Sequence, residues 1–153
     1  MRRARISQGQ VDEFPEGAVW NQFIEFLSQS DFEELAPEQR GAFVAFWYDA
    51  EVQNGRHFQY LLNRGAEEAR TAIPELHRVG AVDFAKLLGE CLEAWSASAR
   101  NQPADVEEFV SKALVGEFDE FDARYYATEP TLMEILDSHL QKNTSLYVDV
   151  YDA

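Results

Sequence analysis

Acidic side chains are the residues of this sequence whose number and spacing point most clearly to a chemical role. The chain has 28 Asp and Glu against 13 Lys and Arg, which gives a formal net charge of −15. Their densest arrangement is EFDEFD, residues 117–122, where Phe118 and Phe121 stand three positions apart. Such spacing lets the two rings anchor one helix face while the acids point elsewhere. Fixed carboxylates accept charge-assisted hydrogen bonds from Arg and Lys, so the segment favours binding of a cationic surface. A merely solvated helix face is the alternative.

The acids gather in two parts of the chain. Residues 105–153 contain twelve acidic and three basic residues, and a smaller acidic cluster falls between the first two predicted helices. Like charges this close repel one another, so we interpret both groups as binding surfaces. The candidate partner-binding residues are all acidic: Asp105, Glu107, Glu108, Glu117, Asp119, Glu120 and Asp122 near the C-terminus, and Asp31, Glu33 and Glu34 near the N-terminus.

The net charge limits the classes of partner. A strong negative field repels nucleic acid and anionic membranes and attracts basic proteins, which include most DNA-binding proteins. We therefore expect neither direct nucleic-acid binding nor membrane binding. The N-terminus, MRRARISQGQ, also lacks the apolar stretch of a signal peptide or membrane span. The single cysteine, Cys91, excludes an internal disulfide and predicts a buried thiol in a cytoplasmic protein.

Motifs of common enzyme classes are absent from the sequence. There is no GxGxxG, P-loop, GxSxG, HExxH or paired CxxC. His57, His77 and His139 are far apart, and none has a carboxylate or histidine at the spacing of helical metal ligands. We therefore expect a binding protein with no catalytic site, metal or cofactor. An enzyme that uses a carboxylate pair in a cleft between helices stays open as an alternative.

Helical periodicity accounts for most of the chain. Apolar side chains recur every three or four positions, and Gly, Pro and Asn-Gly signals separate the periodic stretches. The expected helices cover residues 17–29, 37–54, 56–65, 66–79, 82–95, 105–113 and 131–140. The sequence thus predicts an all-α fold, a single compact domain of about seven helices.

Several segments interrupt or flank these helices. Pro74 predicts a kink or a restarting helix because proline lacks a backbone N–H, and residues 96–103 are expected to form a loop. Residues 1–16 are expected to be a flexible N-terminal arm, ahead of a helical domain over residues 17–142. Residues 143–153 are expected to be a tail that is either irregular or docked on the domain, because a lone terminal strand without a partner is only marginally stable.

Two stretches of the chain are similar to a known family. Residues 54–81, NGRHFQYLLNRGAEEARTAIPELHRVGA, and residues 117–140, EFDEFDARYYATEPTLMEILDSHL, resemble the small acidic DNA-mimic proteins of bacteria, first described as a domain of unknown function. The shared features are an Asn-Gly-x-x-x-Gln stretch and a later helix closed by Gly-Ala. Asn54, Gly55 and Gln59 form the first, and Gly80 and Ala81 the second. The resemblance extends over roughly residues 17–142, and Arg56 stands where a second glycine is often found.

The resemblance implies a helical, often dimeric fold whose surface carboxylates replace duplex phosphates. Such a protein occupies the DNA-binding face of a transcription factor or nucleoid protein and blocks its access to DNA. A homodimer is expected from the resemblance alone, and none of the shared motif residues implies a partner contact. The alternative is an immunity-type protein that neutralises a basic toxin or nuclease by electrostatically steered binding.

Overall fold

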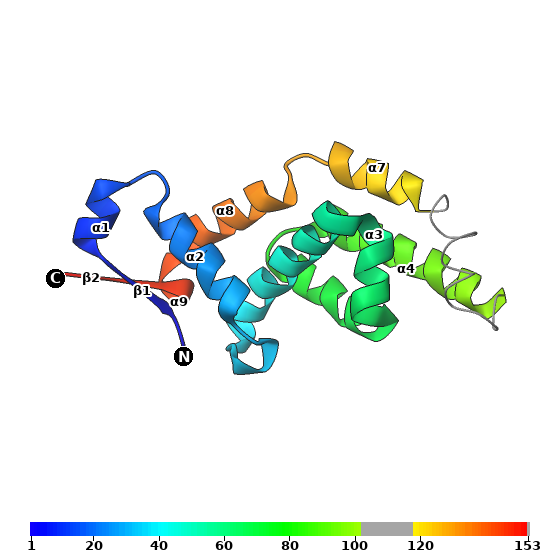
Figure 1. Ribbon diagram of the computed structural model, residues 1–153, viewed down its shortest axis with the longest axis horizontal. Coiled ribbons are helices and arrows are strands. Elements are labelled where there is room, and N and C mark those ends of the chain that lie inside the picture. The colour runs from blue at the N-terminus through cyan, green and yellow to red at the C-terminus, as the bar shows by residue number, and fades with distance from the viewer. Residues whose placement is uncertain (102–117, 153) are drawn as a thin grey trace.

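The computed structural model describes residues 1–101 and 118–152 (Figure 1). Within these residues the chain forms seven α-helices, one short 3-10 helix and two four-residue strands. The longer helices are α2 (Ala18–Gln29), α3 (Pro37–Arg78), α4 (Val82–Asn101), α7 (Asp119–Ala127) and α8 (Leu132–Lys142); the shorter ones are α1 (Gln8–Glu13), η1 (Phe32–Glu34) and α9 (Thr144–Tyr147). The all-α prediction is confirmed.

Helix α3 is not one straight helix but three consecutive segments. Its backbone leaves helical angles at Gly55, Arg56 and Gly65, which separates residues 37–54, 57–64 and 66–78. Gly65 has a φ of 83°, a left-handed conformation that glycine adopts without strain. Arg56 adopts a φ of 65° although it has a side chain. The breaks predicted at Asn54-Gly55 and at Gly65 are therefore confirmed, and these breaks let the segments pack against one another.

Pro74 lies inside the last segment of α3, and no residue beside it has non-helical backbone angles. The helix restarts at Gly65 rather than at Pro74. Pro74 is exposed, so water can bond the carbonyl that its missing N–H leaves free. The kink or restart expected at Pro74 is therefore not observed, whereas the separately predicted break at Gly65 is.

The end of α4 differs from the sequence expectation. Residues 96–101, expected to be part of a loop, continue the helix to Asn101. Serine, alanine and arginine tolerate a helix, and the first helix-breaking residue of this stretch is Pro103. The predicted helix over residues 105–113 lies outside the described residues. The last predicted helix is confirmed as α8, with Thr131 and Glu134 forming a capping box at its start.

The two ends of the chain pair with each other, so the N-terminus is not the predicted flexible arm and the C-terminal segment is docked rather than irregular. Strand β1 (Ala4–Ser7) lies parallel to β2 (Val148–Tyr151). Ile6 is buried, and the side chain of Ser7 caps α1. The side-chain amide of Gln39, in the first turn of α3, donates to the carbonyls of Arg2 and Leu146, 2.7 Å away in each case. The terminal strand is stabilised by a partner from the opposite end, which the local sequence pattern does not reveal.

The hydrophobic core runs along α3. Helices α2 and α8 pack on its first segment, and α4 and α7 pack towards the other end of the molecule (Figure 1). The largest fully buried side chains include Phe23, Tyr48, Leu76 and Phe84. Cys91 is buried as predicted, and burial raises the pKa of its thiol. No helix within the described residues is both long and apolar enough to cross a membrane.

Candidate functional site

The structure separates the sequence-predicted acidic residues into three groups. Asp31, Glu33 and Glu34 are exposed on and beside η1, between α2 and α3. Asp119 and Glu120 are exposed in the first turn of α7. Asp122 is set apart from both groups. The other predicted residues of the C-terminal third lie outside the described residues: Asp105, Glu107, Glu108 and Glu117.

Asp122 is not a surface residue, which corrects its assignment to the partner-binding set. Its side chain is only 7% exposed, and its Oδ1 lies 2.8 Å from Nδ1 of His57. The same oxygen accepts a hydrogen bond of 3.0 Å from the backbone N–H of His57. The buried face of α7 carries Phe118, Asp122 and Tyr125, at helical spacing. The sequence pattern of two phenylalanines obscured that face, because Phe121 is only half-buried.

The His57 ring also contacts a second polar side chain in the core. Its Nε2 lies 2.6 Å from the hydroxyl of Tyr48, and both side chains are fully buried. We refer to Asp122, His57 and Tyr48 as the buried polar chain. His57 follows the break at Gly55 and Arg56, where a restarting helix leaves backbone N–H groups without intrahelical acceptors. Asp122 satisfies one of these groups from another helix, so the buried polar chain joins α7 to the bend of α3.

Two further contacts hold α7 in this position. The hydroxyl of Tyr125 donates to the carboxylate of Asp49 on the first segment of α3. The guanidinium of Arg124 pairs with Glu90 on α4. The buried polar chain is therefore one of several polar links across a packed interface between helices.

Carboxylate, imidazole and hydroxyl in series is also the order found at activated nucleophiles. Here burial, with smaller effects of Cys91 and Tyr60, raises the pKa of Tyr48 well above its usual range. A raised pKa keeps the phenol protonated, whereas activation requires the opposite shift. Within the described residues, no group of three His, Cys, Asp or Glu side chains is placed to hold a metal ion. The arrangement suits a structural hydrogen-bond network better than a reactive centre.

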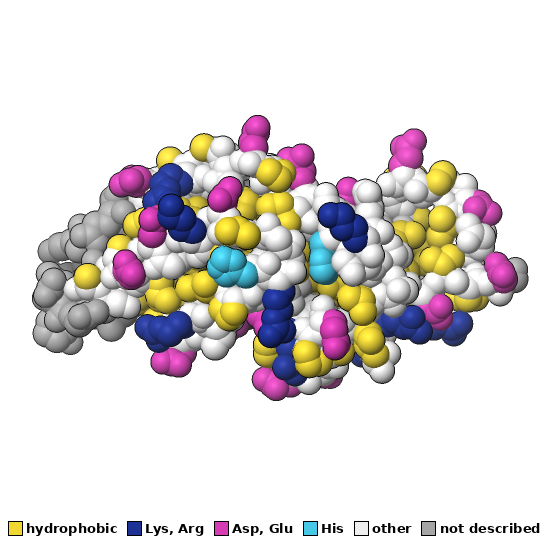
Figure 2. Space-filling model, turned by 180° about the vertical axis from the view of Figure 1, so that it is seen from behind, with side chains coloured by type: hydrophobic (Ala, Val, Ile, Leu, Met, Phe, Trp, Pro, Cys, Tyr) yellow, Lys and Arg dark blue, Asp and Glu magenta, His cyan; other side chains and the backbone are white. Residues whose placement is uncertain are grey.

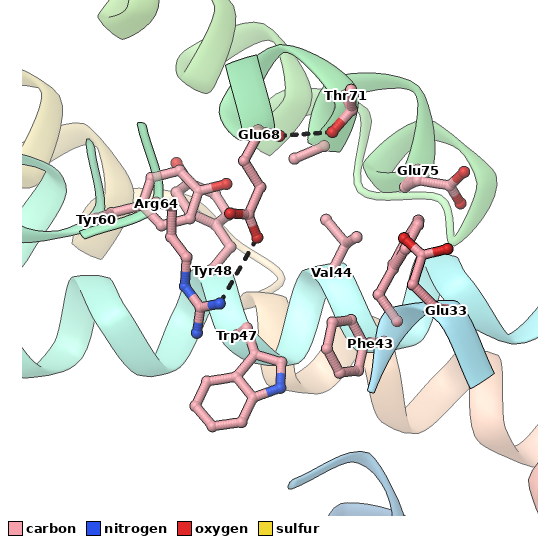
Figure 3. Close-up of a pocket in the computed structure, with 12 residues that line it drawn as sticks. Glu33, Phe43, Val44, Trp47, Tyr48, Tyr60, Arg64, Glu68, Thr71 and Glu75 are labelled. Atoms are coloured by element: carbon pink, nitrogen blue, oxygen red, sulfur yellow. Dashed lines mark hydrogen bonds and ion pairs between the residues drawn. The ribbon is translucent and has the colours of Figure 1, made fainter. Parts of the chain in front are cut away.

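A cavity of about 570 Å³ opens beside this chain, between η1 and the folded-back segments of α3 (Figure 3). We call it the acidic aromatic pocket. Its aromatic lining consists of Phe32, Phe43, Trp47, Tyr48 and Tyr60. Its charged lining consists of Glu33, Glu68, Glu75 and Arg64. Tyr48 thus belongs both to the pocket wall and to the buried polar chain.

Within the described residues, some charged side chains in and beside the pocket have close ion-pair partners, and others do not. Arg64 lies between two carboxylates, 3.4 Å from Glu51 and 3.6 Å from Glu68. Burial tends to raise the pKa of Glu51, but hydrogen bonds from Gln59 and Asn63 and the charge of Arg64 outweigh it and lower that pKa. Glu75 is less well satisfied. Its Oε1 lies 3.5 Å from Arg78, and its Oε2 is buried without a hydrogen-bond partner among residues 1–101 and 118–152.

Only Glu33 of the pocket belongs to the residues singled out from the sequence. Phe32 comes from η1, and the others come from the three segments of α3, which the breaks at Gly55 and Gly65 fold together. The sequence did signal those breaks. The sequence did not indicate which faces of the segments would meet, so it predicted no pocket between them.

Comparison with known proteins gives one positive result. A family model described as DMP19-like protein matches residues 33–143, which include α3, α4, α7 and α8. No curated protein and no solved structure matches the chain. Because the family model covers well over half of the sequence and spans both the acidic aromatic pocket and the buried polar chain, the chain belongs to the DMP19-like protein family.

Proposed function

We propose that the protein is an acidic DNA mimic. It binds the basic DNA-binding face of a transcription factor or other DNA-binding protein and blocks the access of that protein to DNA. The observation that supports this most strongly is the placement of a net charge of −15. Most acidic side chains of the described residues are exposed; Asp122 is buried, and the side chains of Glu51 and Glu75 are only 13% exposed.

The physical basis of mimicry is competition for the same cationic groups. A duplex carries one charge per about 1.7 Å of its axis, and proteins gain affinity by releasing its condensed counterions. A folded protein lacks that full counterion atmosphere, so it must compensate by fixing its carboxylates and adding apolar contacts. Helices can do so, because successive turns place side chains about 5.4 Å apart.

The exposed acidic residues of the described parts of the chain are the candidates for such contacts. Figure 2 shows acidic side chains distributed along the molecule with apolar side chains between them. Glu34 pairs with Arg2 at 2.8 Å and Asp119 with Arg56 at 3.7 Å, so part of their charge is compensated within the chain. Asp31, Glu33 and Glu120 are the remaining exposed candidates of the described set. Asp122 is no longer a candidate contact.

The proposal also covers the mode of action, the cellular compartment and the oligomeric state. It acts by binding in the cytoplasm, without turnover of a substrate and without a cofactor. The homodimer implied by the resemblance belongs to it as well, and light scattering coupled to size-exclusion chromatography measures that state directly.

The test is a pull-down from the source cell's lysate at low salt, with the purified protein as bait. The matched control bait carries Asp31→Asn, Glu33→Gln and Glu120→Gln, which remove three exposed charges at almost constant side-chain size. We expect wild type to retain a DNA-binding protein that elutes with salt and that added duplex DNA displaces. Retention of the same protein by both baits would reject these contact residues.

Two other results distinguish the competing interpretations. A basic toxin or nuclease in the salt eluate, with restored growth of cells that express it together with this protein, would replace the proposal by the immunity function. Absence of any salt-sensitive partner would contradict binding through the acidic surface altogether.

A further inference from the structure

The acidic aromatic pocket contains a carboxylate without an adequate partner. Oε2 of Glu75 is buried and makes no hydrogen bond to the described residues, and Oε1 has only Arg78 at 3.5 Å. A buried unpaired carboxylate oxygen is costly, since it has lost water and gained no donor. The side chain of Glu75 lines the cavity, and the last torsion of a glutamate is soft, so rotation of the side chain can redirect its oxygens. Among the described residues, this oxygen of the pocket therefore lacks a hydrogen-bond donor.

The chain's own arginines indicate which donor suits these walls. The guanidinium of Arg64 lies over the ring of Trp47, 5.1 Å from its centroid, and at the same time pairs with Glu68. The guanidinium of Arg40 lies 4.7 Å from the centroid of Phe32, which also lines the pocket. Aromatic faces attract cations, and the planar guanidinium stacks on them best. Two walls of the pocket thus already hold guanidinium groups.

Other ligand classes fit less well. The lining has three carboxylates and one guanidinium, and that guanidinium is already paired with Glu51 and Glu68, so an anion would meet net repulsion. A purely apolar ligand would fill the space above Phe43 and Val44 but leave the carboxylate of Glu75 unsatisfied. A cation with an aliphatic stem satisfies both requirements.

We propose that the acidic aromatic pocket receives an arginine side chain of the protein partner. The aliphatic stem and the guanidinium face pack against Phe43 and Trp47, and the N–H groups donate to Glu75 and Glu33. Figure 3 shows the carboxylates of Glu33, Glu68 and Glu75 around the space above these rings. This inference rests on the proposed function, in which the partner's DNA-binding face is basic. It adds a buried anchor to what would otherwise be a flat electrostatic contact.

An anchor of this kind has a specific physical role. Interface affinity concentrates in a few desolvated residues, with arginine and aromatic side chains prominent among them. The exposed acids then steer the encounter, and the pocket holds the complex once water is excluded. Arginine is preferred over lysine because a compact, strongly hydrated ammonium neither stacks on Trp47 nor forms two parallel hydrogen bonds to a carboxylate.

The test uses a small probe and so does not depend on finding the partner. N-acetyl-arginine amide, which carries one positive charge, is titrated into the ¹⁵N-labelled full-length protein. The indole N–H signal of Trp47, assigned with Trp47→Phe, reports on the pocket. We expect saturable shifts with a dissociation constant of about 1 mM, as is reasonable for a ligand of this size. N-acetyl-lysine amide should bind several-fold more weakly, and the uncharged N-acetyl-citrulline amide should not saturate.

Two glutamines provide the matched comparison. Glu75→Gln removes one pocket charge, and Glu67→Gln removes a charge about two turns away on the same segment, where the side chain is 95% exposed. We expect Glu75→Gln to weaken binding about tenfold, the usual loss for one charge-assisted hydrogen bond, and Glu67→Gln to leave it unchanged. Unaltered dispersion of the amide spectrum and an unaltered thermal midpoint show that each variant is folded.

Contradictory outcomes are equally specific. Equal binding of the arginine and citrulline probes, or equal weakening by both glutamine variants, would overturn the pocket assignment. Neither result would contradict the proposed function, because competition with duplex DNA is measured in a separate experiment. Conversely, specific arginine binding in a protein that does not compete with DNA would retain the pocket and reject the mimic.

Discussion

Tyr48 belongs both to the buried polar chain and to the lining of the acidic aromatic pocket, yet the carboxylates of the two regions differ in how well they are hydrogen-bonded. Asp122 accepts two hydrogen bonds from His57, and its side chain is only 7% exposed. Glu75 lines a cavity and has an oxygen with no hydrogen-bond partner in the part of the chain that the structure describes. The first carboxylate is satisfied within the chain and stabilises the fold. The second is incomplete within the chain, which is the property expected of a binding site.

The largest effect that can break this comparison is removal of Asp122. Asp122→Ala leaves the backbone and ring N–H groups of His57 buried without an acceptor, so we expect the free energy of unfolding to fall by about 3–5 kcal/mol. Asp119→Ala is the control, since it lies on the same helix with its side chain 61% exposed and should change that free energy by less than about 1 kcal/mol. Urea denaturation followed by circular dichroism measures both. Equal losses would show that Asp122 is not specially engaged.

A smaller effect is expected at the bend that forms the pocket wall. Gly65 has a φ of 83°, and a Cβ there would meet no atom within 4 Å. The cost of Gly65→Ala is therefore conformational, about 1–2 kcal/mol of unfolding free energy. Gly9→Ala is the control, because Gly9 lies in α1 with ordinary helical angles and should gain up to about 1 kcal/mol. Chemical denaturation of both variants checks this, and a neutral Gly65→Ala would mean that the bend is not fixed by glycine.

The smallest effect concerns a second histidine, outside both regions. Burial, with a minor effect of Lys142, lowers the pKa of His139, whose Nε2 lies 2.7 Å from the hydroxyl of Tyr147. The folded state therefore prefers the neutral ring, and stability that is present above the unfolded pKa of about 6.5 is lost as the pH falls below it. We expect His139→Gln to flatten the dependence of the thermal midpoint on pH between about 7 and 5.5. Parallel curves for wild type and variant would assign the pH dependence to other groups.

The sequence predicted those parts of the fold that depend on local signals. Helical periodicity located α2, α4 and α8, and glycine located the breaks at Gly55 and Gly65. Pairing of β1 with β2 was missed, because each strand is stabilised only by residues from the other end of the chain. The local pattern of residues 148–151 is compatible with a strand, but neither segment identifies the other as its partner.

The candidate site was less predictable for the same reason. Exposed acids such as Glu33 were found by counting charge, since a surface carboxylate needs no special neighbour. Asp122 was misassigned because its partner, His57, is 65 positions away in the sequence. Glu75 was overlooked because its significance depends on a cavity that forms only when the segments of α3 fold back together.

The most direct test of the central claim is a competition experiment with the DNA-binding protein recovered by the pull-down. A fluorescent duplex bound to that protein is titrated with this chain, and the anisotropy of the duplex is recorded at several salt concentrations. Mimicry predicts that the anisotropy falls to the value of free DNA, and that the variant carrying Asp31→Asn, Glu33→Gln and Glu120→Gln competes less well. A rise in anisotropy, which signals a complex of both proteins with DNA, would contradict the account.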